Sequence, residues 1–472
     1  MIPIADRNTG IWNDVLLIIT DKVRMQDIHI DYKLYNYDDL NSDDKNNIYN
    51  QAIVCVTVII TNGTSDSNVK GVIKGNIKHF SNDNDKRKNN DGIEMEDYYF
   101  TLAANEQRVI QLKQIIIGYL NDDYNINNSS ENNSLDLKLW WPIAMGDQNL
   151  YECTLDAFVI ESSDEEYSED NNENDNNVDC NYHSHSISTT FGLRSVFSYI
   201  DSNTGGRIFM INGIKTFIRG VNYTLSDGWL NDYYQVANNN GNKNMQQVSK
   251  MYAELLLLSK TNINMIRLWG GSNTANKYLL LLCQKLGILV WFEFWITGDC
   301  NGRGIPPTNQ QWPLDHSLFL ENAIGRRMNV ERNHDDDNKI FRTNDVYIGG
   351  VCNESAVYNN ASIVIYCGGN EQKPAPDIDL ALTQYFGGNA NNSNSDKLYV
   401  SGSLWSGFGS SDGAFQDGPY GICNPKDFYI DGDNTTNNID DSNIKNDNKK
   451  QSNNVGVATL PYKFGFNPEI GR

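Results

Sequence analysis

Two glutamates in this sequence stand in settings that suit acid–base chemistry. Glu371 follows the apolar run IVIYC and the residues Gly368, Gly369 and Asn370. The two glycines let the backbone turn tightly beside a ligand, and the amide of Asn370 is suited to binding a sugar hydroxyl. A second glutamate, Glu469, lies in KFGFNPEIGR. Two carboxyl groups placed across a glycosidic bond can cleave it, one by donating a proton and the other by attacking or by activating water.

Each glutamate also has a plain structural interpretation. Glu371 lies close to the start of a predicted helix, and a glutamate that follows a proline, as Glu469 does, is usually a surface residue. A third glutamate, Glu293 in WFEFW, has apolar neighbours on both sides. It is either functional or a buried residue paired with Arg267 or Arg219. Local sequence alone leaves these roles open.

The carboxylates need a rigid frame, and the pattern after Gly205 predicts one. Short apolar strands are expected at 215–222, 263–269, 288–295, 361–371 and 397–403, with helices at 251–260, 276–287, around 317–333 and at 377–386. Strands that alternate with helices indicate a parallel sheet with crossover connections. In a barrel of this kind the functional side chains lie at the C-terminal ends of the strands, which is where Glu371 stands.

Residues 21 to 200 follow a different pattern. The segments 52–61, 69–80, 98–103, 107–117 and 150–160 combine β-branched residues and alternation with turn-rich gaps. Several short strands without helical segments indicate a β-sandwich. Inserts rich in Asn and Asp at 81–92, 121–134 and 161–178 interrupt them. Their low hydrophobicity predicts solvated, disordered loops.

The composition excludes several classes of partner. The chain has 472 residues, enough for two or three domains, and a net charge of −22. We therefore expect neither nucleic acid nor an anionic membrane as a partner, because phosphate groups are bound by clustered Lys and Arg. The eight cysteines show no CxxC and no Cys/His ligand spacing, which predicts no zinc site. No apolar run reaches the ~18 residues of a membrane span.

Longer segments make the sequence recognisable. They include DRNTGIW (6–12), LWWPIAMGDQNLY (139–151), GGRIFMINGIKTFIRGVNYTLSDGWL (205–230), LVWFEFWITGDCNGRGIPPTN (289–309), GGNEQ (368–372), GSLWSGFG (402–409) and FGFNPEIG (464–471). In this order they resemble glycoside hydrolase family 2, most closely its plant-type mannosylglycoprotein endo-β-mannosidase branch, near the β-mannosidases and exo-β-glucosaminidases. The resemblance implies a sugar-binding jelly roll, an immunoglobulin-like sandwich and a catalytic (β/α)8 barrel.

The expected fold class is thus multidomain, β and then α/β: an immunoglobulin-like β-sandwich followed by an incomplete (β/α)8 TIM barrel. Residues 1–20 are expected to be the C-terminal remnant of a galactose-binding-like jelly-roll domain, and residues 21–200 the sandwich with its inserts. Residues 201–472 are expected to be the TIM-barrel catalytic domain, truncated at its C-terminal end. An insertion between His334 and Ala361 departs from the family pattern just ahead of the strand that leads to Glu371.

The resemblance also implies roles for single residues. Glu371 in GGNE takes the acid/base position, and Glu469 in FGFNPEIG takes the nucleophile position of a retaining double displacement. Their carboxyl groups are then expected to lie roughly 5–5.5 Å apart. Asn370 is expected to contact the sugar beside the reacting carbon. Further substrate-binding residues are expected at Trp269, Arg267, Glu293, Trp295, Asp299 and Trp405.

The predicted function is hydrolysis of β-mannosidic linkages, by endo action on the N-glycan core or as a β-mannosidase. The alternatives are an exo-β-D-glucosaminidase or another family 2 β-glycosidase, and a non-catalytic carbohydrate-binding fragment. The expected partner is an oligosaccharide or glycoprotein glycan, and the mechanism needs no cofactor and no metal. The resemblance suggests a vacuolar or lysosomal compartment, while the sequence leaves the oligomeric state undetermined.

Overall fold

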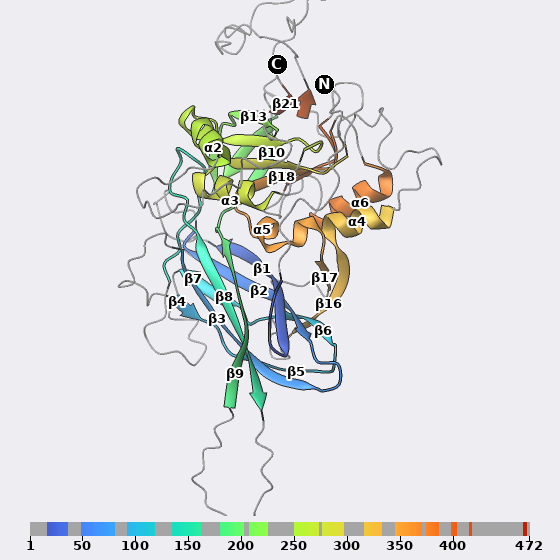
Figure 1. Cartoon of the computed structure of the whole chain (residues 1–472). Coiled ribbons are helices and arrows are strands. Elements are labelled where there is room, and N and C mark those ends of the chain that lie inside the picture. Colours follow the sequence, from blue (N-terminus) through green and yellow to red (C-terminus); the bar gives the residue numbers. More distant parts are fainter. Residues whose placement is uncertain are drawn as a thin grey trace, which may run out of the picture.

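The computed structural model of the chain describes residues 17–35, 49–80, 92–118, 135–161, 180–202, 207–224, 250–272, 276–296, 316–332, 345–370, 374–386, 398–403, 415–417 and 466–469. Most of its elements are strands, and they fall into two parts (Figure 1). The strands β1 to β9 form the first part, and a parallel sheet with its helices forms the second.

One sheet of the first part is built on β2 (Gln51–Asn62). Strand β2 pairs antiparallel with β1 (Val23–Tyr35) on one side, and with β6 (Gln107–Gln111) and β7 (Ile115–Gly118) on the other. The strand expected at 107–117 is therefore two strands, which pair with different stretches of β2.

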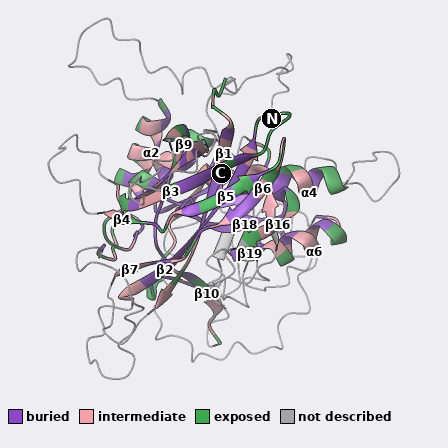
Figure 2. Cartoon of the chain, turned by 90° about the horizontal axis from the view of Figure 1, so that it is seen from below, coloured by how far each residue is buried: buried purple, intermediate pink, exposed green. Residues whose placement is uncertain are grey.

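The second sheet of this part is built on β3 (Val69–His79). Strand β3 pairs antiparallel with β8 (Tyr151–Glu161), β4 (Gly92–Glu94) and β5 (Tyr98–Leu102), and β8 pairs with β9 (Cys180–Phe191). Alternate residues of β5 are buried and exposed, as expected of a strand with one face on a core. Buried side chains of both sheets form one hydrophobic cluster, so the sheets pack face to face, and burial is concentrated along their strands (Figure 2).

The second part contains a five-stranded parallel sheet in the order β13, β14, β15, β18, β19. Its strands span Gly220–Tyr223, Met265–Leu268, Leu289–Glu293, Ile363–Cys367 and Leu398–Val400. The helices α2 (Lys250–Lys260), α3 (Lys277–Leu286), α4 (His316–Ile324) and α6 (Pro376–Tyr385) lie between these strands in the chain. The predicted alternation of strand and helix is confirmed.

Helix α3 shows how local sequence sets these boundaries. The side chain of Asn276 accepts a hydrogen bond from the backbone N–H of Leu279 at 3.0 Å and so caps the first turn. Gly287 ends the helix with a φ of 73°, a left-handed conformation that glycine adopts without strain. Strand β15 begins two residues later, which fixes where its side chains emerge from the sheet.

The two faces of the parallel sheet have different neighbours. On β15, Val290 and Phe292 pack with residues of the helices, whereas Leu289 and Trp291 belong to a cluster with β10 (Val196–Ile200) and β11 (Arg207–Ile211). Strand β12 (Ile214–Thr216) completes this small antiparallel sheet. Because side chains alternate along a strand, residues in register with Trp291 also point away from the helices.

The helix expected around 317–333 is shorter than predicted. Helix α4 ends at Ile324, and Gly325 follows with a φ of 81°. The chain then forms β16 (Arg326–Arg332) and β17 (Asp345–Ile348), an antiparallel pair. Strand β16 also pairs in parallel with β6, so this hairpin extends the first sheet of the first part. The prediction failed because a partner more than 200 positions earlier in the chain decides the conformation of these residues.

After β17, residues 350–361 link the two parts of the molecule. They include the short helices η2 (Val351–Asn353) and α5 (Ser355–Tyr358). Buried Asn359 accepts a hydrogen bond from the N–H of Ile30 at 2.9 Å and donates to the carbonyl of Ile28 at 2.7 Å and the hydroxyl of Thr189 at 3.0 Å. The described part of the predicted insertion therefore docks against the first part just before β18 begins.

The remaining described strands are β20 (Phe415–Asp417) and β21 (Phe466–Glu469), which pair in parallel. Among the described helices, none combines the length and apolar character that a membrane crossing requires.

Candidate active site

Arg267 and Glu293 lie near the C-terminal ends of neighbouring parallel strands, β14 and β15. Arg267 is in register with Trp291, two residues before Glu293. Both charged side chains therefore lie on the face of the sheet that points away from the helices. The sequence allowed this pairing as a structural interpretation of Glu293, and the structure confirms that the pair exists.

The two side chains form a buried ion pair. The Nε and Nη2 atoms of Arg267 donate to Oε2 of Glu293 at 3.0 and 2.8 Å. The other carboxylate oxygen, Oε1, accepts from the backbone N–H of Gly270 at 3.0 Å. Glu293 is 0% exposed and Arg267 is 5% exposed. Both carboxylate oxygens thus have donors, which a charge in the interior requires.

Arg267 also connects the ends of three further strands. Its Nη2 donates to Oδ1 of Asn370 at 2.6 Å and to the hydroxyl of Ser403 at 2.9 Å, and its Nη1 donates to Oδ1 of Asn222 at 3.2 Å. Asn370 follows β18, Ser403 follows β19, and Asn222 lies in β13. A single guanidinium therefore links residues from all five strands of the sheet, and we call these five residues the Arg267 network.

Asn370 is held by the backbone as well. Its N–H donates to the carbonyl of Ile296 at 2.7 Å, and the N–H of Ser403 donates to the carbonyl of Gly369 at 3.0 Å. Gly368 makes this close approach possible, because a Cβ there would lie 2.4 Å from the carbonyl oxygen of Ser401. Gly368 therefore allows the tight backbone path that was expected of Gly368 and Gly369.

These bonds fix the orientation of the Asn370 amide. Since Oδ1 accepts from Arg267, the Nδ2 group is left as the donor, and it has no acceptor among the residues that the structure describes. An amide N–H of this kind, next to a hydroxyl and a charged pair, can bind a hydroxyl group of a neutral ligand. The network as a whole offers a rigid set of hydrogen-bonding groups at the end of the sheet.

A buried thiol lies on the same face of the sheet, next to the ion pair. Burial raises the pKa of Cys367 well above its usual value, and the negative charge of Glu293 raises it further. The thiol therefore stays neutral and adds no charge to the network. Within the described residues, no group of three or more His, Cys, Asp or Glu side chains is placed to hold a metal ion.

The structure describes two of the predicted aromatic residues, Trp269 and Trp295. Trp269 follows β14 and is half-buried, with its ring where a Cβ on Gly271 would be. Trp295 is half-buried on the helix side, where its ring centroid lies 5.4 Å from that of Phe319 in α4. Trp295 therefore contacts α4, and its predicted contact with substrate stays a prediction.

Several predicted residues lie outside the described part of the chain. They are Glu371, Asp299 and Trp405. Glu469 is the last residue of β21, in register with Asp417 of β20. The predicted approach of the Glu371 and Glu469 carboxyl groups therefore stays a prediction.

Sequence reasoning missed two members of the network, Asn222 and Ser403. The available signal was their position, since each lies at or just beyond the C-terminal end of a predicted strand. Their small polar side chains gave no reason to rank them above other Asn and Ser residues in so polar a chain.

The chain was compared with known proteins. No family model matches the chain. A mannosylglycoprotein endo-β-mannosidase of Lilium longiflorum is 30% identical over 498 residues, which cover 100% of this chain and 39% of the lily protein. A β-mannosidase B of Aspergillus clavatus is 28% identical over 204 residues, or 41% of this chain and 19% of that protein. The chain thus spans less than two fifths of the length of either relative.

A solved structure has a similar fold. The exo-chitosanase of Amycolatopsis orientalis aligns with a TM-score of 0.52 at 16% identity, covering 88% of this chain and 36% of that chain. This likeness concerns the fold alone. The match to the lily protein over the whole chain bears out the resemblance found in the sequence, because the chain is similar to endo-β-mannosidases and β-mannosidases of the glycoside hydrolase family 2 type.

Proposed function

We propose that this chain carries the catalytic site of a retaining glycosidase that hydrolyses β-mannosidic linkages. The observation that supports this most is the Arg267 network, which holds Asn370 at the end of β18 with its amide donor available. Glu371 is the next residue in the chain, so the proposed acid/base belongs to the same strand end. The similarity to the lily endo-β-mannosidase supports the choice of sugar.

The proposed mechanism has two displacements. Glu371 donates a proton to the leaving oxygen while Glu469 attacks the anomeric carbon and forms a glycosyl ester. Glu371 then deprotonates a water molecule, which releases the sugar with its configuration retained. In this proposal Asn370 donates a hydrogen bond to a sugar hydroxyl beside the reacting carbon, and Arg267 and Glu293 hold that amide in place.

We also propose the finer architecture that the family suggests. The parallel order of β13, β14, β15, β18 and β19 supports interpreting this sheet as one wall of a (β/α)8 barrel within residues 201–472. The two packed antiparallel sheets support an immunoglobulin-like sandwich within 21–200. Residues 1–20 are proposed as the end of a jelly-roll domain. Trp269, Trp295, Asp299 and Trp405 remain proposed substrate contacts.

The test uses two substrates that differ in leaving group. Glu371→Gln should slow hydrolysis of a mannosyl N-glycan core by about 10²–10⁴-fold, the usual contribution of general acid–base catalysis. Hydrolysis of nitrophenyl β-mannoside should be less affected in its first step, because nitrophenolate leaves without protonation. Glu469→Gln should abolish turnover of both substrates. A Glu371→Gln variant with unchanged rates on the glycan would refute the proposal.

Matched controls separate the proposal from its alternatives. Glu354→Gln removes a carboxylate that is paired with Lys277 on the surface, and it should leave both rates unchanged. Faster hydrolysis of a β-glucosaminide than of the mannoside would favour an exo-glucosaminidase. Saturable glycan binding without any turnover would favour a carbohydrate-binding fragment. Proton NMR of the first-formed anomer tests retention directly.

A further inference from the structure

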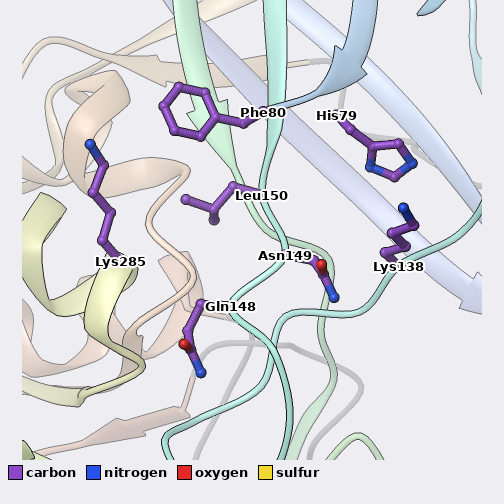
Figure 3. A pocket seen from close by; sticks show the side chains of 7 residues that line it. All are labelled: His79, Phe80, Lys138, Gln148, Asn149, Leu150 and Lys285. Carbon is purple, nitrogen blue, oxygen red and sulfur yellow. The ribbon is translucent and has the colours of Figure 1, made fainter. Parts of the chain in front are cut away.

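A pocket lies where the two parts of the molecule meet, and none of the residues of the Arg267 network lines it. It has a volume of about 200 Å³ and is lined by His79, Phe80, Lys138, Gln148, Asn149, Leu150 and Lys285 (Figure 3). His79 ends β3 and Lys285 lies in the last turn of α3. Two hydrogen bonds cross the junction nearby, from the indole of Trp140 to the carbonyl of Gln284 and from the N–H of Ile143 to the carbonyl of Gly287.

The charge of this pocket is opposite to that of the protein. The chain carries a net charge of −22, yet two lysines and a histidine line the pocket and, among the residues that the structure describes, no Asp or Glu does. Figure 3 shows Lys138 and His79 on one side and Lys285 on the other, with the carboxamides between them. The ammonium of Lys285 lies 5.4 Å from the ring centroid of Phe80, a contact that does not neutralise its charge.

Neither lysine has a carboxylate partner among the described residues. Within the part of the chain that the structure describes, the side chains of Lys138 and Lys285 form no ion pair, in contrast to Lys78, which pairs with Glu152 at 3.1 Å. Both side chains line the same pocket, so their positive charges together favour an anion within it. The pocket therefore has the electrostatics of an anion site.

The carboxamides of Gln148 and Asn149 restrict the chemistry of the ligand further. Gln148 donates through Nε2 to the carbonyls of Trp141 and Gly146 at 3.1 and 2.9 Å, and Asn149 donates through Nδ2 to the carbonyl of Leu139 at 3.0 Å. Both N–H bonds of the Gln148 amide and one of the Asn149 amide are used within the chain, so the carboxamide oxygens are the main groups left to a ligand. Carbonyl oxygens accept hydrogen bonds, so the ligand should carry hydroxyl groups as well as its charge.

We propose that this pocket binds a small phosphate-bearing molecule, with the phosphate between the lysines and any hydroxyl groups on the carboxamide oxygens of Gln148 and Asn149. The volume equals that of about seven water molecules in the liquid, which fits a phosphate ion or a short phosphorylated polyol but not a glycan chain. Bound there, the ligand would contact β3 and α3 together and so stabilise the junction. This site is independent of the proposed glycosidase activity.

Calorimetric titration of the whole chain tests the proposal with inorganic phosphate, glycerol 3-phosphate and, as the uncharged reference, glycerol. Saturable binding of either phosphate compound, and none of glycerol, is expected. Tighter binding of glycerol 3-phosphate would identify a phosphorylated polyol as the ligand, and equal binding would identify the free ion. The Lys138→Met/Lys285→Met variant should lose about tenfold or more in affinity, since two charges near the phosphate are removed.

Lys70→Met is the matched control, because Lys70 is an exposed lysine of the same strand, β3, that does not line the pocket. It should bind as the parent chain does. Hydrolysis of nitrophenyl β-mannoside should be unchanged in the double variant, which keeps this test separate from that of the active site. Absence of saturable phosphate binding, or equal loss of affinity in Lys70→Met and the double variant, would overturn the proposal.

Discussion

The Glu293→Gln substitution tests the central claim about the Arg267 network. Gln has nearly the same shape as Glu but only one oxygen, whereas Glu293 uses both, one for Arg267 and one for the N–H of Gly270. The amide nitrogen of Gln must therefore face a donor on one side. The buried guanidinium of Arg267 also loses its counter-charge. Breaking a buried pair in this way costs about 3–5 kcal/mol in the free energy of unfolding.

Urea unfolding followed by tryptophan fluorescence measures this loss. Glu152→Gln is the control, because Glu152 pairs with Lys78 on the surface at 3.1 Å, with side chains 27% and 46% exposed. A surface pair contributes about 0–1 kcal/mol. The double variant Arg267→Met/Glu293→Gln should be more stable than the sum of the single effects predicts, because no uncompensated charge remains. A loss under about 1 kcal/mol for Glu293→Gln, equal to that of the control, would refute the reasoning.

Three further predictions follow from the described contacts. Asn359→Ala removes bonds to Ile28 and Ile30, which leaves buried backbone groups without partners, and should lower the free energy of unfolding by about 2–4 kcal/mol in the same urea assay. Gly270→Ala places a Cβ about 2.1 Å from the carbonyl oxygen of Phe294 and should lower the melting temperature measured by calorimetry. Burial raises the pKa of Cys153 to about 12, so iodoacetamide should leave this thiol unlabelled in the folded chain and label it in urea, as peptide mapping will show.

Each of these expectations has an outcome that contradicts it. An Asn359→Ala chain as stable as the parent would mean that residues 350–361 do not hold the two parts together. An unchanged melting temperature in Gly270→Ala would mean that the backbone near Phe294 moves freely. The raised pKa of Cys153 also fixes how stability changes with pH. The folded chain holds the thiol proton more tightly than the unfolded chain, whose thiol has a pKa of about 8.5. The stabilisation is therefore fully present below that value and is lost as the pH rises above it. Rapid labelling of the folded thiol would refute its burial.

Much of the fold could be predicted from local pattern. The expected elements include strands β2, β3, β5 and β8 and, in the second part, strands β14, β15, β18 and β19 with helices α2, α3 and α6, because their residues carry the period of the element that they form. Helix α3 was expected at 276–287 and spans Lys277–Leu286, because Asn276 and Gly287 are its two caps. The strand β16 could not be predicted. Its parallel pairing with β6 depends on Val109, far away in the sequence, and no period within 317–333 reveals it.

The sequence indicated some of the residues that belong to the candidate site, but it did not indicate the hydrogen bonds between them. The strand-end position singled out Asn370 beside Glu371, whereas Arg267 and Glu293 were expected as substrate-binding residues from the family resemblance. The bonds that join them depend on the exact register of four strand pairings, and the register shift between Val290 and Trp291 is not visible in the sequence. Asn222 and Ser403 were missed for the same reason, because only the register shows that a guanidinium reaches them.

The hairpin β16–β17 has a consequence for synthesis of the protein. The free edge of β6 is covered by a strand that the ribosome makes about 200 residues later. At roughly 5–20 residues per second, this leaves the edge open for about 10–40 s. An open edge is a template for pairing with other chains. Once β16 is made and pairs with β6, that edge is no longer available to other chains.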